Sequence, residues 1–111
     1  MGITHATAQG PRSYQEDRYC FFSIRKPQTI IAVMDGHGGD EVAEFCSRNL
    51  EKVFKDTRGK ITDRLGKVIR NLAEATSHHY EAGSTISIVS VTNHWAHVAF
   101  LGDSPVIIRT A

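Results

Sequence analysis

The sequence predicts an α+β fold in which antiparallel β-sheets pack on a pair of antiparallel helices. Segments rich in β-branched and aromatic residues occupy both ends of the chain, and two segments with helical periodicity lie between them. The turns that join these segments are short. Strands that are separated from helices in this way favour antiparallel pairing over alternating β-α-β units. The expected order of elements is β-β-β-α-α-β-β-β.

The strands expected before the helices end in a strongly apolar run. Residues 18–24 (RYCFFSI) are rich in aromatic side chains, and residues 29–34 (TIIAVM) are nearly continuous in apolar character. A run of the second kind is typical of a strand that is buried on both faces. Ahead of both, Gly10-Pro11 is a turn signal that follows a short polar segment.

Two amphipathic helices are expected in the middle of the chain. Between residues 40 and 54 apolar side chains recur at spacings of three and four, with charged residues between them, and Asp40 or the glycine before it starts the helix. The segment 58–60 (RGK) interrupts this pattern. A second apolar pattern then runs over residues 61–75, with Gly66 as a weak point inside the helix.

The remainder of the chain is expected to be β-rich. Residues 84–91 alternate between polar and apolar side chains, and residues 95–101 form a second apolar segment. A tight turn over residues 102–105 then leads into a last expected strand at residues 106–108. Because no internal repeat or linker separates these segments, we expect a single domain over residues 1–111.

The composition excludes several classes of function. Of the 111 residues, 41% are apolar and 23% are charged, as in globular proteins and unlike disordered chains. Thirteen Lys and Arg residues against twelve Asp and Glu residues give a net charge of +1, so no global field attracts nucleic acid or an anionic membrane. No apolar run is long enough to span a bilayer, and the first residues lack a signal-peptide pattern. We therefore expect a cytoplasmic protein with no membrane partner and two reduced cysteines, Cys20 and Cys46.

The sharpest local pattern is Asp35-Gly36-His37-Gly38-Gly39, directly after the apolar run. A carboxylate at the end of a strand, followed by a glycine-rich turn with open carbonyl groups, offers the oxygen ligands that Mg²⁺ and Mn²⁺ prefer. The alternative from the residues alone is that Asp35 caps the following helix and His37 is a surface turn residue. Both interpretations remain open at this stage.

A second polar cluster lies upstream, from Arg12 to Arg18. Glu16 and Asp17 are further oxygen donors, and the planar guanidinium of Arg12 suits a phosphate group. Taken alone, this cluster also fits a solvated polar loop. Asp103, in the Gly-Asp-Ser turn, fits an ordinary turn residue equally well.

Four motifs occur together and in one order along the chain. They are Arg12 followed after three residues by Glu16-Asp17, then Asp35-Gly36-His37-Gly38-Gly39, then Gly83-Ser84-Thr85, and finally Gly102-Asp103-Ser104. With two helices in the expected interval, these motifs resemble the amino-terminal half of the metal-dependent protein phosphatases of the 2C type. The resemblance covers nearly the whole chain.

The resemblance implies a truncated 2C-type β-sandwich that hydrolyses phosphoserine and phosphothreonine in phosphoproteins or phosphopeptides. Two Mn²⁺ or Mg²⁺ ions would activate the attacking water. Asp35 would bridge the two ions, with further oxygens from Glu16 and the carbonyl of Gly36, and Asp103 would support an additional, weaker metal site. As catalytic residues, Arg12 would hold the phosphate oxygens and His37 would donate a proton to the leaving oxygen.

The sequence also departs from the family pattern. The family's second half supplies two further aspartate ligands, whereas this sequence ends at Ala111, and Pro105 stands where an Arg commonly follows Gly-Asp-Ser. Three interpretations stay open: a minimal active phosphatase, a non-catalytic metal-binding or protein-interaction module, and a piece of a larger enzyme. Because each sheet of the family's sandwich uses strands from both halves, we expect exposed sheet edges and a homodimer formed through them.

Overall fold

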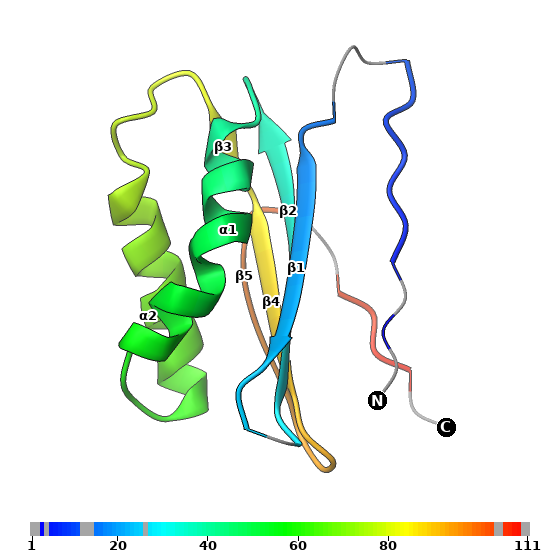
Figure 1. Cartoon of the computed structure of the whole chain (residues 1–111), viewed down its shortest axis with the longest axis vertical. Helices are drawn as coiled ribbons and strands as arrows, with labels where there is room; N and C mark the ends of the chain where they lie inside the picture. Colours follow the sequence, from blue (N-terminus) through cyan, green and yellow to red (C-terminus); the bar gives the residue numbers. More distant parts are fainter. Residues whose placement is uncertain (1–2, 4, 12–14, 26, 104–105, 110–111) are drawn as a thin grey trace.

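The described part of the chain forms a two-layer arrangement of one antiparallel sheet and two helices (Figure 1). The computed structural model describes residues 3, 5–11, 15–25, 27–103 and 106–109. Within these ranges the strands pair in the order β1-β2-β4-β5, and the short strand β3 also pairs with β2. In chain order the elements are β1 (Asp17–Ser23), β2 (Thr29–His37), α1 (Glu41–Asp56), α2 (Ile61–Ala75), β3 (Gly83–Ser84), β4 (Ile86–Val91) and β5 (Ala96–Leu101).

The predicted α+β class is confirmed, and three strands follow the helices as predicted, but the strands at both ends of the chain differ from those expected. Two strands rather than three precede the helices, because residues 5–11 contain no strand. The strand expected at residues 106–108 is absent as well. β-Propensity makes a strand only where a neighbouring strand accepts its hydrogen bonds, and neither segment pairs with one within the described residues.

The strand β2 is buried on one face only, which corrects the prediction of burial on both faces. Ile30, Ala32 and Met34 are almost completely buried, whereas Val33 is 48% exposed. This alternation arises because both helices cover the same face of the sheet, as Figure 1 shows. We call the helix-covered side the inner face and the opposite side the outer face.

The helices supply most of the buried side chains that pack against the inner face of the sheet. Their buried residues recur on one stripe of each helix, as the sequence predicts, and α1 packs on β1 and β2 while α2 packs mainly on β5. The interruption at residues 58–60 is a short connection, and Gly66 does not break α2. The buried residues of the two helices are Val42, Ala43, Cys46, Leu50 and Phe54 in α1 and Leu65, Val68 and Leu72 in α2.

The carboxyl end of α1 is tied to α2 by the side chain of Arg64. The guanidinium of Arg64 donates to the carbonyl of Phe54 at 2.7 Å and lies 3.8 Å from the centre of the Phe54 ring. The last carbonyls of a helix have no partner within the helix, so this contact satisfies one of them. The desolvation that accompanies this packing lowers the pKa of Arg64.

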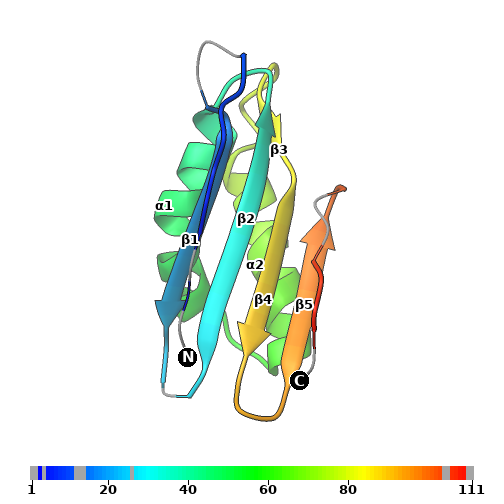
Figure 2. The ribbon, with the colours of Figure 1, turned by 90° about the vertical axis from the view of Figure 1, so that its right-hand side faces the viewer.

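The two ends of the described chain lie on the outer face. Figure 2 views that face directly and shows residues 5–11 running over β1 and residues 106–109 running beside β5. His5 stacks on Tyr19 with ring centres 4.2 Å apart, so the first of these segments contacts the sheet. Of the helices in the described ranges, none has the length and apolar character needed to cross a bilayer.

Candidate active site

The candidate site lies at the end of β2, where the sheet meets the turn into α1. Asp35 is the third-last residue of β2, and its side chain is exposed on the outer face, between the buried positions Met34 and Gly36. Asp17 is its direct cross-strand neighbour on β1. Directly paired residues share a face of the sheet, so two aspartates occupy the same end of the outer face.

The main chain of Asp35 is fixed from the other side by the Gly-Ser-Thr segment. The amide of Asp35 donates to Oγ1 of Thr85 at 3.1 Å, and the amide of Thr85 donates to the carbonyl of Asp35 at 3.0 Å. The next residues continue this pairing, because Gly36 lies opposite Ser84. Two of the sequence motifs, 48 residues apart, therefore form one local structure.

Glu16 lies against the glycine-rich turn. Its carboxylate accepts a hydrogen bond from the amide of Gly39 at 2.8 Å, and its carbonyl accepts one from the amide of Gly36 at 3.3 Å. A Cβ atom on Gly36 would lie 2.6 Å from that carbonyl oxygen, so only glycine allows the two backbones to approach this closely. The structure thus brings Glu16, Asp35 and Gly36 to one end of the sheet.

Asp103 joins Asp35 at a hollow on the outer face. This hollow of about 400 Å³ is open to solvent, and both carboxylate residues line it. Its remaining walls are apolar apart from one serine, with residues Ile31, Val33, Ser87, Val89 and Val106. Two of the predicted metal ligands, 68 positions apart in the sequence, therefore face the same space.

His37 is the last residue of β2, and its side chain is exposed. It lies opposite Gly83 in the pairing of β2 with β3, and its ring lies over that glycine. Arg12, the other predicted catalytic residue, lies outside the residues that the structure describes.

The alternative role of Asp35 as a helix cap is wrong. The helix α1 begins at Glu41, and its N-cap position is Asp40. The side chain of Asp40 makes no capping bond to the helix. It accepts a hydrogen bond from Arg18 at 2.8 Å instead.

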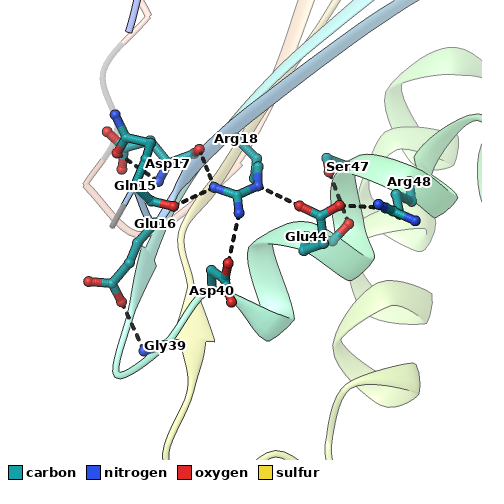
Figure 3. A network of polar contacts seen from close by, with 9 residues as sticks. All are labelled: Gln15, Glu16, Asp17, Arg18, Gly39, Asp40, Glu44, Ser47 and Arg48. Carbon is teal, nitrogen blue, oxygen red and sulfur yellow. Dashed lines mark hydrogen bonds and ion pairs between the residues drawn. The ribbon is translucent and has the colours of Figure 1, made fainter. Parts of the chain in front are cut away.

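Arg18 is a residue of the site region whose role the sequence does not reveal. Figure 3 shows its guanidinium between the start of β1 and the first turn of α1, with contacts to Glu44 at 2.5 Å, Asp40 at 2.8 Å and the carbonyl of Gln15 at 2.6 Å. The hydrogen bond to Glu44 raises the pKa of Arg18, and the same bond lowers the pKa of Glu44.

This network holds the segment that carries Glu16 and Asp17 against the helix that follows the glycine turn. A second arginine, Arg48, also contacts Glu44 from the next turn of α1. The two carboxylate partners of Arg18, Asp40 and Glu44, lie 22 and 26 residues away along the chain, so no local spacing in the sequence signals them.

The comparisons with known proteins fit this arrangement. The family model described as protein phosphatase 2C matches residues 5–111, which is nearly the whole chain. The chain belongs to the protein phosphatase 2C family.

Individual relatives agree with this membership. A probable protein phosphatase 2C of Oryza sativa (number 59) is 34% identical over 118 residues, which cover 94% of this chain and 35% of the rice protein. A probable protein phosphatase 2C of Arabidopsis thaliana (number 69) is 33% identical over 118 residues, with coverages of 94% and 32%. This phosphatase 2C chain therefore spans about a third of the length of these curated relatives.

A solved structure shares the fold. The structure of a C. elegans sex-determining protein matches with a TM-score of 0.72 and 25% sequence identity, over 85% of this chain and 28% of that one. The sheet and helix pair of this phosphatase 2C chain therefore recur inside a much longer protein.

The donors of this phosphatase 2C chain fit a divalent metal in kind but not in number. Asp35 and Asp103 offer hard oxygen ligands at an open hollow, which suits Mn²⁺ or Mg²⁺. However, no three acidic, histidine or cysteine side chains gather closely enough to hold an ion within the described ranges. Water or protein groups beyond these residues would have to complete the coordination.

Proposed function

We propose that this chain carries the amino-terminal part of the metal-dependent active site of a protein serine/threonine phosphatase. The observation that supports this most strongly is that Asp35 and Asp103 line one open hollow, beside the turn that holds His37. Membership of the protein phosphatase 2C family supports the reaction class. The substrate class is a phosphoserine or phosphothreonine side chain in a protein or peptide.

The proposed roles divide between metal binding and catalysis. Mn²⁺ or Mg²⁺ would be held by Asp35, Asp103, Glu16 and the carbonyl of Gly36. When bound, such an ion lowers the pKa of a coordinated water and makes it a nucleophile for phosphorus. Arg12 holds the phosphate oxygens by paired N–H donors. His37 gives a proton to the seryl or threonyl oxygen as the P–O bond breaks, which keeps that oxygen from leaving as an alkoxide.

A metal titration combined with a phosphatase assay tests this function. Mn²⁺ binding is measured by isothermal titration, and hydrolysis is measured on a phosphothreonine peptide, for the wild type, Asp35→Asn and Asp56→Asn. Asp56 is the matched control, because it ends α1 at the opposite end of that helix from the candidate site. We expect Asp35→Asn to abolish both signals and Asp56→Asn to preserve them.

The second candidate is a non-catalytic module, and one observation favours it. Within the described residues the carboxylates do not assemble into a group of three. A chain that binds Mn²⁺ through Asp35 but leaves the phosphopeptide intact would support a metal-binding module. Absence of both signals in the wild type would contradict the phosphatase and favour a protein-interaction module.

We also propose that the chain forms a homodimer through its exposed sheet edges. The strands β1 and β5 end the pairing order of the sheet, so each has one side without a strand partner within the described residues. Unpaired strand edges present free N–H and C=O groups to another chain. Light scattering on the eluted protein at micromolar concentration should give about twice the mass of 12.3 kDa, and a monomer mass there would contradict the homodimer.

A further inference from the structure

The contact between His37 and Gly83 joins a side chain to bare backbone. The two residues are directly paired between β2 and β3. Side chains of directly paired residues project on the same face, about 5 Å apart at their Cβ atoms. Gly83 has no side chain, so the imidazole has room to lie over its backbone.

The geometry shows how completely the ring uses that room. A Cβ atom placed on Gly83 would lie 2.4 Å from Cε1 of His37 and 2.7 Å from Nε2. Both distances are far inside van der Waals contact, so the ring occupies the volume that any side chain at position 83 would need. The exposed end of β2 therefore holds its histidine against a surface of main-chain atoms.

The backbone conformation of Gly83 does not require glycine. Gly10, Gly38, Gly39, Gly59 and Gly102 have positive φ angles, whereas Gly83 does not. Alanine is therefore allowed at position 83 by its backbone angles. The need for glycine there comes from the imidazole alone.

A second main-chain contact supports the same turn from the same segment. A Cβ atom on Gly38 would lie 2.0 Å from the carbonyl oxygen of Glu81, and Gly38 has φ of 68°. The segment from Glu81 to Gly83 thus lies against both His37 and the glycine that follows it. This segment reaches the turn only after the whole of α2.

We propose that Gly83 is a positioning residue for His37. Because Gly83 has no side chain, the imidazole of His37 lies directly on its main-chain atoms, and this contact restricts the ring to one orientation at the edge of the site. This inference rests on the proposed function, in which His37 donates a proton to the leaving oxygen. Proton donors act efficiently only when they are held within hydrogen-bond reach of the reacting atom.

The test compares Gly83→Ala with Gly66→Ala. Gly66 is the matched control, because a Cβ atom there meets nothing within 4 Å and the residue lies inside α2. The added methyl group at position 83 meets the end of an exposed side chain rather than backbone, so the histidine turns away and the fold persists. We expect thermal unfolding of both variants to stay within a few degrees of the wild type.

The first readout is the NMR spectrum of the histidine rings in the metal-free protein, with His37 assigned through His37→Gln. Gly83→Ala should shift the ring signals of His37 and leave the other five histidines unchanged. In the wild type the Hα signals of Gly83 should carry a ring-current shift that disappears in His37→Gln. Ring signals of His37 that are the same in wild type and Gly83→Ala would overturn the proposal.

The second readout is the rate with two substrates that differ in leaving group. A phosphothreonine peptide needs a proton on its departing oxygen, whereas p-nitrophenyl phosphate releases a stable phenolate. Gly83→Ala should slow the peptide reaction about 10- to 100-fold and affect p-nitrophenyl phosphate much less, because general acid catalysis typically contributes about 10²–10⁴. Equal slowing of both substrates would contradict a role through His37.

The two readouts separate failure of this inference from failure of the proposed function. If the NMR signals of the His37 ring shift in Gly83→Ala but the chain hydrolyses neither substrate, the positioning role of Gly83 is supported and the phosphatase activity is not. If those signals do not shift but the chain is an active phosphatase, the activity is supported and the positioning role of Gly83 is contradicted.

Discussion

The two faces of the sheet differ sharply in what covers them, although both are apolar. On the inner face Ile30, Met34 and Ile88 are completely covered by α1 and α2. On the outer face two neighbouring rows of cross-strand residues carry no formal charge, and all of them except the buried Ser87 remain partly or largely exposed. These rows are Tyr19-Val33-Ser87-Phe100 and Phe21-Ile31-Val89-Val98.

This difference separates stability from function within one sheet. Most antiparallel sheets that face water on one side alternate between apolar and polar residues. Here the outer face has few polar residues, and its charged groups are concentrated at one end, where Asp17 and Asp35 lie side by side. The inner face therefore holds the fold together, and the outer face presents the carboxylates together with an apolar surface suited to binding another layer of protein.

The largest expected effect is a loss of stability in the core between the helices and the inner face. Leu50 is completely buried, so Leu50→Ala should lower the free energy of unfolding by about 2–5 kcal/mol, through lost burial and the cavity left behind. Val33→Ala, on the outer face, should cost less than about 1 kcal/mol because Val33 is already half exposed. Urea denaturation measures both values, and similar losses for the two variants would erase the distinction between the faces.

The reactivity of the two cysteines tests whether the inner face is closed to solvent. Burial raises the pKa of Cys20 to about 12 and that of Cys46 to about 11, from an ordinary value of 9.0. Because the thiolate is the reactive form, both thiols should react with iodoacetamide at pH 8 about 100-fold more slowly in the folded protein than in urea. Mass spectrometry of the alkylated protein measures the rates. Fast labelling in the native state would show that the inner face is accessible to solvent.

The third effect concerns the proposed association through the sheet edge at β5, the strand that carries Phe100. Phe100 is 67% exposed, so Phe100→Lys should change the free energy of unfolding by about 0.5 kcal/mol or less. The same change should weaken self-association about tenfold, because a charge is placed in an apolar contact. Analytical ultracentrifugation measures the dissociation constant, and an unchanged dissociation constant would mean that the dimer contact does not include the edge at β5.

The smallest effect is electrostatic and belongs to the network around Arg18. Because the pKa of Glu44 is lowered in the folded state, its contribution is complete above its ordinary value of 4.5 and is lost as the pH falls through the folded value. The side chain of Glu44 is 34% exposed, so solvent screening limits the contribution to about 1 kcal/mol or less.

Glu44→Gln should therefore destabilise the protein by that amount at pH 7 and by almost nothing at pH 3. Glu74→Gln, at an exposed position of α2, serves as the control and should be neutral at both pH values. A difference for Glu44→Gln that persists at pH 3 would mean that charge is not the cause.

Much of the fold follows from local patterns in the sequence. The spacing of apolar residues predicts both helices to within one or two residues, because a 3.6-residue period depends only on neighbours along the chain. The glycine-rich motif places Asp35 correctly at the end of a strand. The expected strand over residues 84–91 is interrupted at Thr85, whose hydroxyl oxygen accepts a hydrogen bond from the amide of Asp35.

The strands at the ends of the chain could not be predicted in the same way. Residues 5–11 and 106–109 lie over the outer face without joining the sheet, because strand formation needs a partner that the local sequence does not specify. The prediction that β2 is buried on both faces was wrong for a related reason, because coverage of a strand also depends on distant parts of the chain. A continuous apolar run does not reveal whether one face or both are covered.

By itself the sequence determined the identity of the chemical groups: the acidic pair at Glu16-Asp17, the Asp-Gly-His-Gly-Gly turn and the later Asp103. Only the tertiary structure decided which of them meet. It brings Asp103 and Asp35 to one hollow, anchors the start of β1 through Arg18, and seats His37 on Gly83. These contacts join residues far apart along the chain, and their geometry depends on packing two helices against one face of the sheet, which no local pattern encodes.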